Sequence, residues 1–238
     1  MRKLVKLFAL FLMFVFHTSC GQNQTNVPKD NIKSETKDKA TSPGSNEKYP
    51  TKYEYTDSIG KSLVIQNSVR KGGPYTDPKG ISYGKVIFWT RLINETDNPL
   101  ELKIDLPADS IEVPGLPGKY YKLFVPPDTM TIDKELLYDY GMTGVKSFLD
   151  NNIHKPSYLK RTINPKESSG FYVVILFEHW MGAPFGAELS IKGQNLVYRI
   201  SRYESKPAGS MVYEKEINCG SINLKNLKLK TFERSGSF

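Results

Sequence analysis

The residues best suited to chemistry lie in a short aromatic segment, residues 178–186, that follows an apolar run. Trp180 and Phe185 can stack on sugar faces or insert into a partner, and His179 and Glu178 can supply polar contacts beside them. The same pattern also fits a loop that folds its rings back onto a core, because the segment contains Gly and Pro. We therefore treat Glu178, His179, Trp180 and Phe185 as candidate binding residues.

Nucleophilic catalysis has one candidate thiol in the part of the chain expected to fold. Cys219 could act as a nucleophile with His154 or His179 as its base, which would make the protein a hydrolase. A lone Cys near the end of a strand is also typical of a small apolar filler. A pair of carboxylates is another possible catalytic group, but nothing in the spacing of the Asp and Glu residues selects one. We therefore predict no catalytic residue, and the hydrolase stays an alternative.

Metal ions and cofactors have no assembled site in the sequence. Two His and one Cys in the expected folded part cannot complete a structural zinc site without carboxylates, and no pair has ligand spacing. The glycines at 72–73 and 141–144 lack the spacing of phosphate-binding loops, which favours turns. We expect neither a metal nor a cofactor.

Charge is unevenly distributed along the 238 residues. The chain has 33 Lys and Arg against 25 Asp and Glu, a net charge of +8. Residues 1–19 contribute +3 of this and residues 20–50 contribute +1, which leaves +4 for residues 51–238. Such a mild excess is weak support for nucleic-acid binding, and we expect no nucleic-acid partner.

The first 19 residues have the layout of a secretory signal peptide. Arg2, Lys3 and Lys6 precede ten apolar residues, 7–16, and small or polar residues follow at once. A bilayer span needs about 20 apolar residues, so the run is too short to remain as a membrane helix. We expect residues 1–19 to direct export and to be removed.

Cys20 follows the small residues Thr18 and Ser19, and in this respect residues 1–22 resemble the signal peptides of bacterial lipoproteins. The resemblance implies that the Cys20 thiol carries diacylglycerol and begins the mature chain, although His17 stands where the family usually has Leu. It further implies an exported protein anchored by lipid in the cell envelope, in the outer membrane of a Gram-negative bacterium. Ordinary cleavage after Gly21 is the alternative.

Residues 20–50 are predicted to form a disordered tether. They contain only Val27, Ile32 and Ala40 as aliphatic residues before Tyr49. So little apolar surface cannot offset the entropy lost on ordering the chain. The folded domain is therefore expected to span residues 51–238.

The folded domain is predicted to be mainly β, an antiparallel β-sandwich with a short helical insertion. Runs rich in Val, Ile, Tyr, Phe and Thr alternate with turn residues, as in strands and hairpins. The architecture resembles the immunoglobulin-like sandwich without its paired cysteines, and that fold carries too many functions to imply one. The predicted strands are residues 53–57, 62–68, 84–94, 100–106, 111–113, 120–125, 158–163, 170–177, 188–192, 196–201 and 211–216.

The insertion is predicted to span about residues 115–165 and to cover the sandwich. Residues 133–140 and 145–151 have apolar residues at helical spacing, with Thr131 or Asp133 as a possible cap. Residues 170–177 are apolar on both faces, so their outer face needs such a cover. Residues 71–80 are interpreted as a turn-rich loop, and Trp89 as a core residue.

These observations favour a non-enzymatic, lipid-anchored envelope protein that binds another envelope protein or a glycan. The motivation is an anchor and a tether joined to a β domain in which no catalytic constellation is assembled. Two alternatives stay open. One is the envelope hydrolase, and the other is a structural or assembly component that pairs through exposed strand edges.

Overall fold

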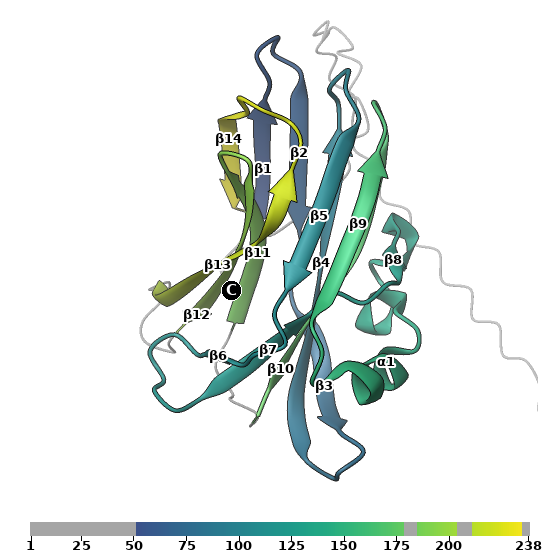
Figure 1. The fold of residues 1–238 in the computed structure, drawn as a ribbon, viewed down its shortest axis with the longest axis vertical. Coiled ribbons are helices and arrows are strands. Elements are labelled where there is room, and N and C mark those ends of the chain that lie inside the picture. The colour runs from purple at the N-terminus through teal and green to yellow at the C-terminus, as the bar shows by residue number, and fades with distance from the viewer. Residues whose placement is uncertain (1–50, 179–184, 204–210, 235–238) are drawn as a thin grey trace, which may run out of the picture. The chain divides into compact units, whose positions relative to one another are not determined.

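The computed structural model describes residues 51–178, 185–203 and 211–234. Two antiparallel sheets pack face to face, and one short α-helix lies beside them (Figure 1). The predicted β-sandwich is therefore confirmed. Within these residues, no helix is long and apolar enough to cross a membrane.

The larger sheet is built around two long strands that lie side by side. Its strand order is β14-β1-β2-β4-β10-β7-β6, with β3 paired to β4 and β8 paired to β10. The pairs β4–β10, β2–β4 and β3–β4 are all antiparallel. The strands are β1 (Thr51–Thr56), β2 (Ser62–Asn67), β3 (Lys71–Thr76), β4 (Ser82–Asn94), β6 (Ile111–Glu112), β7 (Tyr120–Phe124), β8 (Thr129–Met130), β10 (Ser168–Phe177) and β14 (Lys228–Arg234).

The smaller sheet has the order β11-β12-β13-β5-β9. Its β11–β12 hairpin turns at Gly193, whose φ of 66° suits a residue without a side chain. The predicted strands at residues 188–192 and 196–201 form this hairpin. The strands are β5 (Leu100–Leu106), β9 (Ser157–Ile163), β11 (Phe185–Lys192), β12 (Asn195–Tyr203) and β13 (Met211–Ile222).

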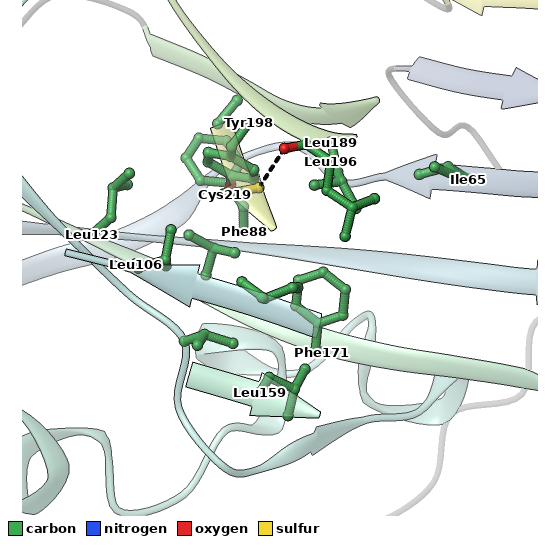
Figure 2. Packing of buried hydrophobic residues seen from close by; sticks show 14 of the residues in the cluster. Ile65, Phe88, Leu106, Leu123, Leu159, Phe171, Leu189, Leu196, Tyr198 and Cys219 are labelled. Atoms are coloured by element: carbon green, nitrogen blue, oxygen red, sulfur yellow. Dashed lines mark hydrogen bonds between the residues drawn. The ribbon is translucent and has the colours of Figure 1, made fainter. Parts of the chain in front are cut away.

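The main core lies between the two sheets, and Figure 2 shows part of it. Phe88 of β4 and Phe171 of β10 point into it from the larger sheet, and Leu189 and Tyr198 enter from the smaller one. All four are almost fully buried. Burial of each such side chain stabilises the fold by about 1.5–3 kcal/mol. The sandwich is therefore held together mainly by this interior, since the described residues hold one thiol and no disulfide.

A second core covers the outer face of β4 and β10. Trp89 and Tyr172 extend from the strands and pack against Tyr140, Met142 and Leu149 of the covering segment. That segment contains two 3₁₀ turns, η1 (Ile132–Lys134) and η2 (Tyr138–Gly141), and the helix α1 (Val145–Asn152). The prediction that Trp89 belongs to a core is confirmed, because it is 1% exposed.

Two local predictions were wrong. Residues 132–134 and 138–141 form 3₁₀ turns where a helix was expected at 133–140, and Thr131 makes no capping hydrogen bond through its side chain. Residues 71–76 form strand β3, although the sequence suggested a loop. Strands β8 and β14 were not predicted. β3 escaped notice because its two glycines and Pro74 are unusual in strands, and Pro74 is tolerated because β3 is an edge strand.

The connection between β2 and β3 shapes one flank of the larger sheet. β2 pairs with the last part of β4, from Thr90 to Asn94, whereas β3 pairs with its first part, from Ser82 to Ile87. Both strands therefore lie on the same side of β4, separated by a short link. In that link the Ser68 hydroxyl accepts a hydrogen bond from the backbone N–H of Trp89, at 2.8 Å. Residues of this link line two cavities.

Candidate binding site

The predicted binding segment is only partly within the described residues. Glu178 is exposed directly after β10, and Phe185 begins β11. Phe185 is 4% exposed, and its ring centroid lies 4.6 Å from that of Phe177. His179 and Trp180 lie outside the described residues. The structure thus brings Phe185 into the core rather than onto an open surface.

Phe185 also lines a cavity of about 200 Å³ beside the link between β2 and β3. Its walls come from both sheets, and most of them are apolar. Arg70 and Glu188 are the charged residues among them. The lining residues are Thr51, Ser68, Val69, Arg70, Phe88, Phe185, Gly186, Ala187, Glu188, Ser201 and Tyr203.

Glu188 is a buried carboxylate whose charge is matched by the protein itself. Its Oε1 accepts hydrogen bonds from the Tyr53 hydroxyl and from Arg199 Nη1, both at 2.8 Å. Its Oε2 lies 3.5 Å from Arg234 Nη2. Burial and the neighbouring carboxylate raise the pKa of Tyr53 well above its usual value, so this hydroxyl keeps its proton and donates. The Glu188 carboxylate therefore serves to join β1, β11, β12 and β14.

A second cavity, of about 380 Å³, also has Arg70 in its lining. Arg70 lines both cavities, so we call the two together the Arg70 groove. At the second cavity, Tyr138 is 79% exposed, whereas Asp139 beside it is only 4% exposed. The residues that line this cavity are Arg70, Lys71, Gly72, Val86, Tyr138 and Asp139.

Tyr138 is presented by a turn with unusual backbone geometry. Asp139 has φ 47° and Tyr140 has φ 57°, and Gly141 continues the left-handed run with φ 62°. For a bulky residue such as Tyr140 this region is a true outlier, and strain of this kind costs about 1–3 kcal/mol per residue. Such a turn persists only where the surrounding structure holds it in place.

Several buried hydrogen bonds hold the turn. The Tyr140 hydroxyl donates to the Val69 carbonyl at 2.6 Å, and the Tyr172 hydroxyl donates to the Tyr140 carbonyl at 2.8 Å. Lys85 of β4 forms a buried ion pair with Oδ2 of Asp139. The other oxygen, Oδ1, is enclosed and has no hydrogen-bond partner among the described residues. The backbone of the turn that carries Tyr138 is therefore held from two strands, β4 and β10, and from the β2–β3 link.

Lys71 adds a cation to the same wall. Its ammonium donates to the carbonyls of Glu135 and Leu137, at 2.6 and 2.7 Å, and lies 4.1 Å from the centroid of the Tyr140 ring. Desolvation lowers the pKa of Lys71 and outweighs the attraction of Glu135 and Asp139. Lys71 thus links β3 to the segment that leads into the turn, and Lys71 is one of the residues that line the cavity.

The candidate nucleophile lies in the core. Cys219 is 1% exposed, and its thiol donates to the Leu196 carbonyl at 3.4 Å (Figure 2). Burial raises the pKa of Cys219 to about 12. Nucleophilic attack needs an accessible thiolate, so these surroundings give no support to Cys219 as a nucleophile. Of its two candidate bases, His154 is exposed and His179 lies outside the described residues.

Metal ligands do not gather in the part of the chain that the structure describes. Among those residues, no group of three or more His, Cys, Asp or Glu could hold an ion. The groups that line the Arg70 groove include an aromatic ring, two cations, carboxylates and hydroxyls.

Sequence reasoning missed Tyr138 and Asp139 as site residues. It placed both in a helix, where Tyr138 would be one position of an apolar stripe. The signal that was present is the Gly that follows at 141, which marks a left-handed turn as readily as a helix end.

No protein-family model, curated protein or solved structure matches the chain.

Proposed function

We propose that this protein is an exported binding module, held in the cell envelope by lipid on Cys20, and that it binds a glycan in the Arg70 groove. The envelope would be that of a Gram-negative bacterium, with the anchor in the outer membrane. The observation that carries the glycan proposal is Tyr138. Its ring is 79% exposed and lies at a cavity that also has charged and hydrogen-bonding groups.

A sugar ring offers both of the surfaces that this groove can recognise. Its C–H face packs on an aromatic ring, and its hydroxyls bond to charged and polar groups. Tyr138 supplies the aromatic face, and Arg70 lies where the two cavities meet. A ligand of several linked sugars could therefore extend from Tyr138 past Arg70 to Ser68 and Ser201.

The rigid turn at Tyr138 favours binding in a second way. The backbone that carries the ring is held by the hydrogen bonds of Tyr140 and by the ion pair of Asp139, so this segment does not have to be ordered when a ligand stacks on the ring. A preorganised contact of this kind costs less entropy than one made by a mobile side chain. In this proposal, the strained backbone of the turn serves to present the Tyr138 ring to the ligand.

The glycan proposal is tested with the full protein purified from membranes in detergent and a glycan array. Tyr138→Ala should weaken binding of any captured glycan by about tenfold, whereas Tyr138→Phe should keep most of it. Tyr158→Ala is the matched control, because Tyr158 is 73% exposed on β9 and does not line the groove. Equal binding by Tyr138→Ala and the unaltered protein would show that the groove is not the site.

The anchor is tested separately by replacing Cys20 with Ala and fractionating the cells. We expect the unaltered protein in the membrane fraction and a large part of the Cys20→Ala protein outside it. Mass spectrometry should find the acyl chains on the N-terminal Cys of the mature protein. An unmodified thiol at position 20 would contradict the anchor without bearing on the groove.

A protein partner is the second candidate, and one observation favours it. Leu136 is 93% exposed and Leu137 is 52% exposed, next to Tyr138 and close in sequence to Ile132, which is 41% exposed. Exposed apolar residues grouped in this way often mark protein contacts. Leu136→Ala should then reduce recovery of a specific partner in a pull-down from solubilised membranes while leaving glycan binding unchanged.

Assembly through the edges of β11 and β3 has less support. Along β11, the Asn67 side chain bonds both the N–H and the carbonyl of Leu189, and the Tyr55 hydroxyl accepts from the N–H of Ile191. These contacts occupy the backbone groups that an added strand would need. On β3, Pro74 has no N–H to offer.

A further inference from the structure

We propose that residues 132–138 form a membrane-contact surface, through which the folded domain rests on the bilayer that holds its anchor. Leu136 and Leu137 enter the acyl chains, and Tyr138 lies at the level of the headgroups, where its ring stays available to a glycan. This inference rests on the proposed lipid anchor at Cys20, and it adds an orientation of the domain on the membrane.

The first argument is the exposure of apolar side chains in this segment. Leu136 is almost fully exposed, and Ile132, Leu137 and Tyr138 are exposed as well. Contact with lipid would remove this apolar area from water, and the free energy gained is proportional to the area. A tyrosine beside leucines also suits the membrane–water interface, because its ring packs on apolar chains while its hydroxyl stays in water.

The second argument is that many backbone groups of this segment are already paired within the protein. The Lys71 ammonium donates to the carbonyls of Glu135 and Leu137. These two carbonyls flank Leu136. The N–H groups of residues 134, 135 and 137 each donate to the carbonyl three residues before. An unpaired backbone group is costly next to lipid, so this pairing lowers the cost of placing the segment there.

The third argument is the place at which the predicted tether, residues 20–50, joins the domain. Thr51, the first residue of β1, lines a cavity together with Val69. The Val69 carbonyl accepts the hydrogen bond of the Tyr140 hydroxyl at 2.6 Å, and Tyr140 follows the segment by two residues. The chain that leads from the anchor therefore enters the domain close to this segment. An anchor also holds the segment at a high local concentration near the bilayer, so that a few apolar side chains suffice for contact.

The charges of the segment favour contact through apolar area rather than through attraction to anionic lipids. Within residues 132–138, Asp133 and Glu135 outnumber the one cation, Lys134. Lys134 lies 3.4 Å from the carboxylate of Asp128. The segment thus has no excess of cations of the kind that binds anionic headgroups. We therefore expect binding that does not weaken when salt is raised.

The experiment uses the chain from residue 20 onward with Cys20→Ala, so that neither the signal peptide nor acyl chains are present. Its binding to vesicles of phosphatidylethanolamine and phosphatidylglycerol is measured by co-flotation at low and high NaCl. We expect salt-independent binding, which should fall by about tenfold or more when Leu136→Glu and Leu137→Glu are combined. Ile59→Glu is the matched control, because Ile59 is also an exposed apolar residue but follows the other end of β1 from Thr51.

A second measurement uses the acylated protein in vesicles of the same lipids and does not depend on the glutamate variants. A spin label is attached at Leu136→Cys or, as control, at Ile59→Cys. The thiol of Cys219 is 1% exposed, which keeps it from competing for the label. The label at position 136 should be reached by oxygen dissolved in the bilayer and shielded from a water-soluble nickel chelate, and the label at position 59 should be reached by the chelate.

The outcomes separate this inference from the anchor and from the glycan site. If the unacylated protein does not bind vesicles and the chelate reaches both labels equally, the membrane contact is wrong, whatever Cys20 carries. If raised NaCl releases the protein, the apolar contact is wrong. If the glutamate variant binds vesicles normally but loses a specific partner in a pull-down, the surface contacts a protein and the lipid proposal is overturned. Glycan binding, which Tyr138→Ala tests on the array, should be unchanged in Leu136→Glu.

Discussion

Replacing Lys85 with Met should destabilise the protein strongly, because it leaves the Asp139 carboxylate buried without a cation. The side chains of the pair are 9% and 5% exposed. Oδ1 of Asp139 already has no partner among the described residues, so the variant would leave both oxygens unmatched. Breaking a buried ion pair from one side costs about 3–5 kcal/mol. That is a large part of a typical stability of about 5–15 kcal/mol.

The magnitude can be checked against an exposed pair in the same molecule. Lys52 and Glu233 lie 3.6 Å apart, with side chains 31% and 62% exposed. Water screens such a pair, and it contributes about 0–1 kcal/mol. Lys52→Met is therefore the matched control, since it makes the same chemical change on a neighbouring part of the same sheet.

The assay is urea unfolding of each variant, followed by circular dichroism. With a urea dependence of about 2 kcal/mol per molar, a loss of about 4 kcal/mol moves the unfolding midpoint by about 2 M. Lys52→Met should move it by less than about 0.5 M. Lys85→Met should also weaken the proposed glycan binding, because the ion pair helps to hold the turn that presents Tyr138.

A double variant decides whether the loss comes from the unpaired charge. Asp139→Asn removes the charge and keeps a residue that tolerates a positive φ. If the reasoning holds, Lys85→Met with Asp139→Asn should be more stable than the sum of the two single losses predicts, by about 0.5–3 kcal/mol. Strictly additive losses would refute an interaction between the two side chains.

Three further predictions concern the interior and the strand pairing. Tyr198→Phe should leave stability unchanged or raise it by up to about 1 kcal/mol in thermal unfolding, because its hydroxyl is enclosed without a partner among the described residues. Gly72→Ala should cost about 1–3 kcal/mol, since a Cβ there would lie 2.1 Å from a backbone oxygen of β4, whereas Gly73→Ala should be tolerated because its nearest neighbour lies at 3.6 Å. Burial raises the pKa of Tyr140 and Tyr172 from 10.0 to about 12, so the folded state binds more protons than the unfolded state above pH 10. Their contribution to stability is fully present below pH 10 and is lost as the pH rises toward 12, which urea unfolding across that range should show.

The strands that could be predicted are those whose own residues show a local pattern of apolar and polar positions. β10 is apolar on both faces, and this alone implies a sheet covered on each side. β5 alternates buried and exposed residues along its whole length, as its sequence does. In β14, all seven residues are exposed, so its sequence has no alternation of buried apolar and exposed polar residues that would indicate a strand. It forms because β1 offers an edge to pair with.

The candidate site could not be predicted, because its geometry depends on contacts between distant residues. The segment around Tyr138 has helical spacing of apolar residues, yet its backbone turns left-handed. The contacts that stabilise this non-helical backbone come from distant residues: Lys85 pairs with Asp139, and Lys71 binds the carbonyls of residues 135 and 137. No local pattern records these partners. Each buried polar contact contributes more free energy than the helix propensity of one residue. Several such contacts therefore outweigh the moderate helix preference of a short segment.

Contacts with distant residues also determine why Phe185, which was predicted to contact a ligand, is buried while Tyr138 is exposed. Phe185 begins a strand whose inward side faces the core, so its ring packs on Phe177. Tyr138 lies between two residues whose side chains or carbonyls are held inward, which leaves its own ring directed outward. Exposure here is decided by the neighbours rather than by the residue type. The glycan site that we propose uses this ring, which the strained turn keeps out of the core beside Arg70 and Lys71.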